Sequence, residues 1–260
     1  MTARLDRRRL AWVVLAAAVL EVIAPIVTIN GPGSSPGAGS GPDLLITPVG
    51  WAFSIWGVIY ALAIAQAIAV LVVGRDGGPT VSRRLQVDLV VLYLGGALWI
   101  VLAGFDSSAA TAAALLLMLV AGVDAVLTVS REHAAPRWLA RLTRASVGLY
   151  AGWVTAAFFL NVSTALVDAG AVEADDLGWQ LVALVIAAAT LVLLTVMTRG
   201  VVTYAVAGTW ALFGIAVTGG ADGTAEVVVT AAVAAAVLVA SLVAVRVAGR
   251  RRAPELSPRR

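Results

Sequence analysis

The sequence predicts an all-α fold, a bundle of transmembrane helices that crosses the bilayer about eight times with both ends in the cytoplasm. Three observations lead there. Hydrophobic residues make up 61% of the 260 residues and charged residues only 13%, about half the charged fraction of soluble domains. The apolar residues form eight runs long enough to span a bilayer. All positively charged side chains are arginines, in short clusters between those runs.

The first candidate span covers residues 10–30 and follows three consecutive arginines, Arg7 to Arg9. Glu21 and Pro25 interrupt its apolar run, and no small-residue cleavage site follows, so we expect a retained helix rather than a cleaved signal peptide. The other candidate spans cover residues 47–73, 87–105, 108–130, 145–167, 178–198, 200–218 and 226–247. A transmembrane barrel would need alternating apolar and polar residues, which these runs lack.

The arginines predict the orientation, because cytoplasmic loops are enriched in positive charge. With eight spans and a cytoplasmic N-terminus, every arginine lies inside or at the inner boundary. The opposite loops carry only acids: Asp43, Asp106, Asp168, Glu173, Asp175, Asp176, Asp222 and Glu226. Removing one span would place later arginine clusters outside. The distribution therefore predicts a multi-pass protein of the cell (inner or plasma) membrane with both termini in the cytoplasm.

Two outer loops divide the chain. Residues 31–46 are rich in Gly, Ser and Pro, and residues 169–177 form an acidic loop. We expect a five-helix unit over residues 1–168, a three-helix unit over 178–247 and a basic cytoplasmic tail over 248–260. The last three spans are mostly Ala, Val and Leu, so we expect them to act as a support or as the surface of a homodimer.

Aromatic residues concentrate in the first five spans. Phe53, Trp56 and Tyr60 are spaced i, i+3 and i+7, and therefore share one face of a helix. The full set of candidate ligand-binding residues is Pro48, Trp51, Phe53, Trp56, Tyr60, Tyr93, Trp99, Tyr150, Trp153 and Asn161. Aromatic rings at mid-depth line a cavity for a flat apolar ligand in one interpretation. In the other, they only fill the bundle.

The order of these residues resembles the TspO/MBR family, the translocator or tryptophan-rich sensory proteins. The matching blocks lie in the second, third and fifth spans. They are Pro48, Trp51, Trp56 and Tyr60; Leu92, Tyr93, Gly95 and Trp99; and Tyr150, Trp153, Leu160 and Asn161. The resemblance covers about residues 10–168, and the last three spans have no counterpart in short family members. It implies a pocket for a porphyrin or sterol-like ligand, with residues 31–46 as its lid.

Two acids lie inside predicted spans, where a carboxylate is costly and usually faces the bundle interior or a wet cavity. Glu21 lies near the middle of the first span, and Asp124 about six residues from the cytoplasmic end of the fourth. One interpretation is a proton or cation site. The other is a protonated acid that bonds to a neighbouring helix.

Other chemistry is poorly supported. The chain has no cysteine and one histidine, His133, so we expect no metal centre. No Ser/His/Asp set or phosphate-binding glycine loop is present, and we expect no catalytic residues and no cofactor. Clustered arginines do not indicate nucleic-acid binding. We expect a TspO-like receptor or carrier, surrounded by membrane lipid, for a hydrophobic small molecule such as a tetrapyrrole. The alternative is a small-solute or proton-coupled permease that uses Glu21 and Asp124.

Overall fold

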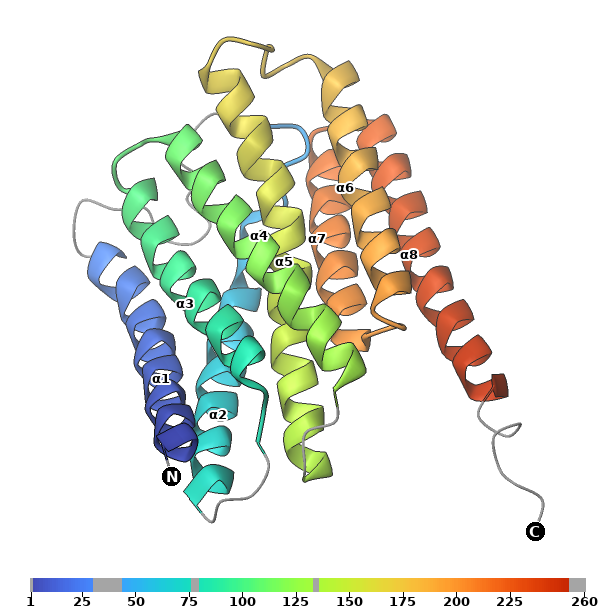
Figure 1. The fold of residues 1–260 in the computed structure, drawn as a ribbon. Coiled ribbons are helices and arrows are strands. Elements are labelled where there is room, and N and C mark those ends of the chain that lie inside the picture. The colour runs from blue at the N-terminus through green and yellow to red at the C-terminus, as the bar shows by residue number, and fades with distance from the viewer. Residues whose placement is uncertain (1, 30–43, 76–79, 133–135, 253–260) are drawn as a thin grey trace.

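The computed structural model describes residues 2–29, 44–75, 80–132 and 136–252, and they form a bundle of antiparallel helices (Figure 1). Most of the expected lid, residues 31–43, lies outside the described residues. A short 3-10 helix, η1 (Gly50–Ser54), precedes the second long helix. The long helices are α1 (Thr2–Ile29), α2 (Ile55–Arg75), α3 (Arg83–Ala103), α4 (Ser108–Arg131), α5 (Arg137–Asp168), α6 (Leu177–Met197), α7 (Val202–Ala221) and α8 (Ala225–Arg252).

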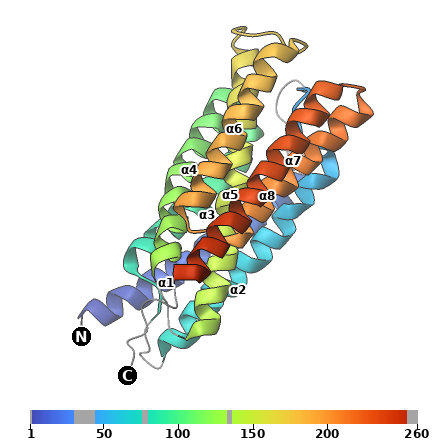
Figure 2. The ribbon, with the colours of Figure 1, turned by 90° about the vertical axis from the view of Figure 1, so that its right-hand side faces the viewer.

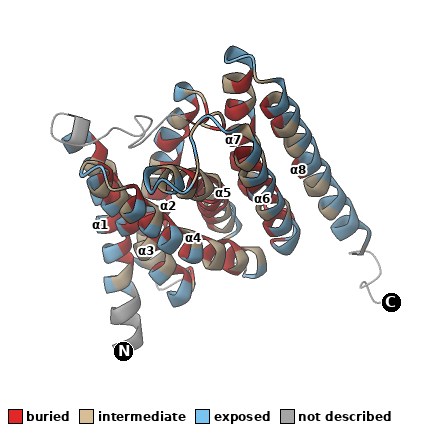
Figure 3. Ribbon diagram, turned by 90° about the horizontal axis from the view of Figure 1, so that it is seen from above, coloured by how far each residue is buried: buried red, intermediate tan, exposed pale blue. Residues whose placement is uncertain are grey.

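All eight long helices are long and apolar enough to cross a membrane, which confirms the predicted helical bundle. Large apolar side chains cover the outer surface, among them Val58, Leu117, Val185 and Val233. Seen from above, the exposed positions lie on the outside of the bundle and the buried ones on its inner faces (Figure 3). A soluble protein rarely exposes apolar patches of this extent, whereas lipid tails solvate them.

Charge is divided between the two ends of the bundle. The start of α1 and the end of α8 lie at the same end (Figures 1 and 2). The helix ends and turns there carry the described arginines, whereas those at the opposite end carry Asp106, Asp168, Glu173, Asp175, Asp176, Asp222 and Glu226. We call the former the arginine-rich end.

α5 is the central helix and packs against α2, α4, α6 and α7. α5 begins eight residues before the predicted span. Leu139, which has no exposed surface, extends the buried face of the helix into this added part. Two glycines of α5, Gly148 and Gly152, bring α7 close to it. A Cβ atom added at Gly152 would lie 2.9 Å from the Cβ atom of Ala207, so the close packing of α5 against α7 depends on small residues.

Candidate ligand-binding site

Trp56 is the centre of a cluster of aromatic rings from α2, α3 and α5. It is 3% exposed. Its ring stacks on Tyr60 and Trp99 at centroid distances of 5.5 and 5.7 Å. It meets Tyr150 and Trp153 edge to face at 5.9 and 6.4 Å. These separations lie within the favourable range for aromatic pairs. The structure thus brings together residues that are up to 97 positions apart in the sequence.

Two further rings extend this aromatic cluster at its edges. Phe53 of η1 packs edge to face on Trp153 with a centroid distance of 5.6 Å. Tyr93 of α3 is almost completely buried and lies 5.8 Å from Tyr150. Seven of the ten predicted ligand-binding residues therefore belong to one continuous set of rings.

Asn161 provides a polar contact at the rim of the aromatic cluster. Its Oδ1 atom accepts a hydrogen bond from Trp99 Nε1 at 3.3 Å. Its Nδ2 atom donates to the carbonyl oxygen of Ala157, one turn earlier in α5, at 3.0 Å. These bonds fix the orientation of the Asn161 side chain and of the Trp99 ring.

Trp51 does not join the aromatic cluster. It is 45% exposed and packs on α7, with centroid distances of 5.2 Å to Trp210 and 5.9 Å to Phe213. The reason is local. Residues 50–54 form a 3-10 helix, in which successive side chains turn by about 120° instead of 100°. Trp51 lies two residues before Phe53, so in either geometry its side chain points away from the face that Phe53 shares with Trp56 and Tyr60.

α7 holds the segment that leads into α2. Trp210 Nε1 donates to the carbonyl oxygen of Ala52 at 2.7 Å, and the backbone N–H of Val49 donates to the carbonyl oxygen of Gly214 at 3.2 Å. A Cβ atom added at Gly214 would lie 2.9 Å from that of Ala52 and 3.1 Å from that of Pro48. Sequence reasoning missed Trp210 and Gly214, because nothing local shows that they meet residues about 160 positions earlier.

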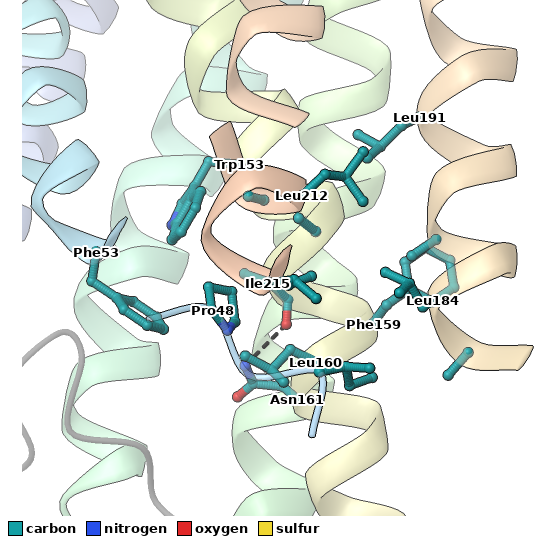
Figure 4. A pocket seen from close by; sticks show the side chains of 16 residues that line it. Pro48, Phe53, Trp153, Phe159, Leu160, Asn161, Leu184, Leu191, Leu212 and Ile215 are labelled. Atoms are coloured by element: carbon teal, nitrogen blue, oxygen red, sulfur yellow. Dashed lines mark hydrogen bonds between the residues drawn. The ribbon is translucent and has the colours of Figure 1, made fainter. Parts of the chain in front are cut away.

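A small apolar cavity lies beside the aromatic cluster (Figure 4). Its volume is about 50 Å³, and its walls come from α5, α6, α7 and residues 46–53. Pro48, Phe53, Trp153 and Asn161 are the predicted site residues that line it. Sites for drug-sized ligands measure roughly 300–1,000 Å³. A ligand of that size therefore enters only if the walls separate, and Ile46, at the described end of the expected lid, is one of them.

Glu21 lies against the aromatic cluster and has no exposed surface. Its Oε1 atom accepts a hydrogen bond from the Tyr150 hydroxyl, which also lies 3.2 Å from the carbonyl oxygen of Leu92. The carboxyl group fits over Gly96, where an added Cβ atom would collide with it. Its Oε2 atom has no hydrogen-bond partner among the described residues.

Three hydrogen-bond donors around the aromatic cluster likewise lack a partner in the described part of the chain. The indole N–H groups of Trp56 and Trp153 and the Tyr93 hydroxyl are buried and have no hydrogen-bond partner among the described residues. Such groups are expensive where no water replaces the missing bond. The aromatic cluster therefore combines ring faces with unused hydrogen-bonding capacity.

Asp124 has a different environment. It forms an ion pair with Arg84, whose Nε atom lies 2.6 Å from Asp124 Oδ2. Glu21 packs against Gly96. Gly96 lies twelve residues after Arg84 on α3, or about 18 Å along the helix. The two predicted acids thus do not form one site. Sequence reasoning missed Asp88, one turn after Arg84. The Oδ2 atom of Asp88 is buried and has no hydrogen-bond partner in the part of the chain that the structure describes. The described residues contain no cluster of three or more His, Cys, Asp or Glu side chains that could hold a metal ion.

Comparison with known proteins supports the resemblance seen in the sequence. No curated protein and no solved structure matches the chain. The family model of TSPO-like proteins matches residues 10–245, from α1 into α8. The match therefore extends beyond the residues 10–168 that carry the motifs and includes the last three helices. With its eight apolar helices, the chain is a multi-pass membrane protein that belongs to the family of TSPO-like proteins.

Proposed function

We propose that this protein is a membrane receptor or carrier for a flat, mostly apolar small molecule such as a porphyrin. The observation that supports this proposal best is the aromatic cluster, in which Trp56 contacts four other rings from three helices. Ring faces favour a flat ligand, and each aromatic pair contributes about 0.5–1.5 kcal/mol. The indole N–H groups of Trp56 and Trp153, which have no partner among the described residues, offer hydrogen bonds to the polar atoms of the ligand.

The ligand enters where the cavity meets the aromatic cluster. Phe53 and Trp153 belong to both, so separation of residues 46–53 from α5 exposes ring faces and enlarges the cavity in one movement. In this proposal α7 has a direct role, because it holds the segment that must move.

The remaining properties follow from this role. We propose that the arginine-rich end faces the cytoplasm of the cell (inner or plasma) membrane, as the positive-inside rule predicts. We further propose that the protein performs no catalysis, that a porphyrin is its ligand rather than a resident cofactor, and that the α8 side is available for a homodimer.

A titration of the purified full-length chain with protoporphyrin tests the proposal. Insertion of the macrocycle between aromatic rings shifts its main absorption band, and this signal does not depend on the tryptophan content of a variant. We expect a saturable shift with a stoichiometry of one ligand per chain. A spectrum that changes only in proportion to detergent concentration would show partition into micelles and reject the proposal.

A proton-coupled permease is the second candidate, and Glu21 is the observation that favours it. A fully buried carboxyl group, with one oxygen that has no hydrogen-bond partner among the described residues, lies in a helix that is long and apolar enough to span the membrane. Asp88 lies two turns before Gly96 on α3, toward the arginine-rich end. Proteoliposomes with an imposed pH gradient and a trapped pH-sensitive dye distinguish the candidates when porphyrin and small polar solutes are added in turn. A permease admits protons with its solute and loses this flux in Glu21→Gln, whereas a receptor admits none.

A further inference from the structure

An open groove of about 790 Å³ lies at the arginine-rich end, and none of its lining residues belongs to the aromatic cluster. One wall is the turn between α6 and α7, and the other is the last part of α8. Three arginines line it, Arg199 from the turn and Arg246 and Arg250 from α8. Its apolar lining includes Val196 and Val245. The groove thus combines positive charge with an apolar surface at one end of the helices that are long and apolar enough to span a membrane.

The fold holds the side chain of Arg246 in place and gives Arg199 an unusual backbone conformation. Arg246 Nη1 donates to the carbonyl oxygen of Gly200 at 3.2 Å. Gly200 has a φ of +72°, and a Cβ atom there would lie 3.0 Å from Arg246 Cγ. Arg199, the preceding residue, has a φ of +57°, a left-handed conformation that is uncommon for residues other than Gly, Asn and Asp. An arginine therefore occupies a position where asparagine is easier to accommodate.

The three arginines lack an acidic partner among the described residues, where the one ion pair is Arg84–Asp124. At this end of the bundle, the acids whose side chains the structure describes are Asp88 on α3 and Asp124 and Glu132 at α4, whereas α8 packs against α6 and α7. The groove therefore concentrates positive charge that no described carboxylate neutralises. An anionic ligand would supply the missing charge.

We propose that this groove binds the headgroup of an anionic phospholipid. Guanidinium groups bind phosphate oxygens with paired hydrogen bonds, and basic pockets between transmembrane helices bind anionic headgroups at the cytoplasmic side. The arginines receive the phosphate, and an acyl chain lies along Val196 and Val245 toward the membrane interior. The proposal is independent of the ligand of the aromatic cluster.

Native mass spectrometry of the full-length protein tests the proposal, with phosphatidylglycerol and phosphatidylcholine of identical acyl chains as probes. We expect phosphatidylglycerol to bind at least about fivefold more tightly. Arg199→Asn and Arg250→Gln should each lower its affinity about fivefold, the contribution of one arginine near an anionic surface. Arg141→Gln is the matched control, because Arg141 is exposed at the same end but lies on α5 outside the groove. The affinity of Arg141→Gln for phosphatidylglycerol should equal that of wild type.

Arg199→Asn also separates binding from folding. Because asparagine tolerates a positive φ, this variant should melt in phosphatidylcholine at or above the temperature of wild type while it loses phosphatidylglycerol. Three results would overturn the proposal: equal affinity for the two lipids, an equal loss in Arg141→Gln, or displacement of phosphatidylglycerol by the same concentration of inorganic phosphate. The last would identify a general anion site without a lipid.

Discussion

The large polar side chain of Glu21 packs against Gly96, which has no side chain. An added Cβ atom at Gly96 would collide with the Glu21 carboxyl group and lie 2.8 Å from the Tyr150 hydroxyl oxygen. We therefore expect Gly96→Ala to destabilise the protein by about 1–3 kcal/mol, the usual cost of overpacking a core. Gly57→Ala is the control, because no atom lies within 4 Å of its added Cβ. Thermal unfolding in detergent should show a lower Tm for the first variant only.

The hydrogen bond between Tyr150 and Glu21 gives a second prediction at this scale. In Glu21→Gln the amide oxygen still accepts from the Tyr150 hydroxyl, so the fold should be retained. In Tyr150→Phe the buried carboxyl group loses the one partner that it has among the described residues, which should cost about 1–3 kcal/mol. Chemical denaturation of both variants measures the difference. If Tyr150→Phe is as stable as wild type, the contact does not hold the carboxyl group.

The candidate residues were partly predictable from the sequence. Phe53, Trp56 and Tyr60 follow helical spacing, and the rings that they contact belong to the motif blocks of the third and fifth spans. We could therefore expect these rings to meet. That Glu21 lies beside these rings could not, because periodicity places a residue on a face but does not say which helix covers it. Trp51 belongs to the same motif block as Trp56, but it packs on Trp210 and Phe213 of α7 instead of on these rings.

At the scale of elements, α7 fixes the entrance to the candidate site through Gly214 and Trp210. Gly214→Ala should push the segment around Pro48 and Ala52 away from α7, because the new methyl group would lie within 3.1 Å of both. We expect faster amide hydrogen exchange over residues 49–54. Gly220→Ala, on the same helix with no atom within 4 Å of its added Cβ, should exchange like wild type. Unchanged exchange in Gly214→Ala would mean that α7 does not hold this segment.

The existence and order of the helices were predictable, because eight apolar runs and one-sided arginines define them. The role of the last three was not. Their sequences contain few polar or aromatic residues, and only the three-dimensional contacts show that α6 and α7 line the cavity beside the motif residues. The division into a five-helix unit and a three-helix unit stays a prediction, and the shared cavity walls are the place to examine it.

At the scale of the whole molecule, the distribution of charge predicts the orientation in the membrane. The native chain has no cysteine, so single cysteines report accessibility without background. Ala171→Cys lies in the exposed turn after α5, and Glu132→Cys lies at the exposed end of α4 on the arginine-rich side. An impermeant thiol reagent added to intact cells should label the first and not the second. The reverse pattern would invert the orientation.

The central claim is that the aromatic cluster binds a flat apolar ligand, and protoporphyrin affinity in Trp56→Phe tests it most directly. Phenylalanine keeps one smaller ring, so the change reduces the ring area that faces the other four rings and removes an N–H group that has no partner among the described residues. Trp138→Phe is the matched control, because Trp138 is 50% exposed at the arginine-rich end of α5. We predict that Trp56→Phe weakens binding about tenfold, equivalent to about 1.4 kcal/mol, while Trp138→Phe binds like wild type. Equal affinity in wild type and both variants would contradict the account.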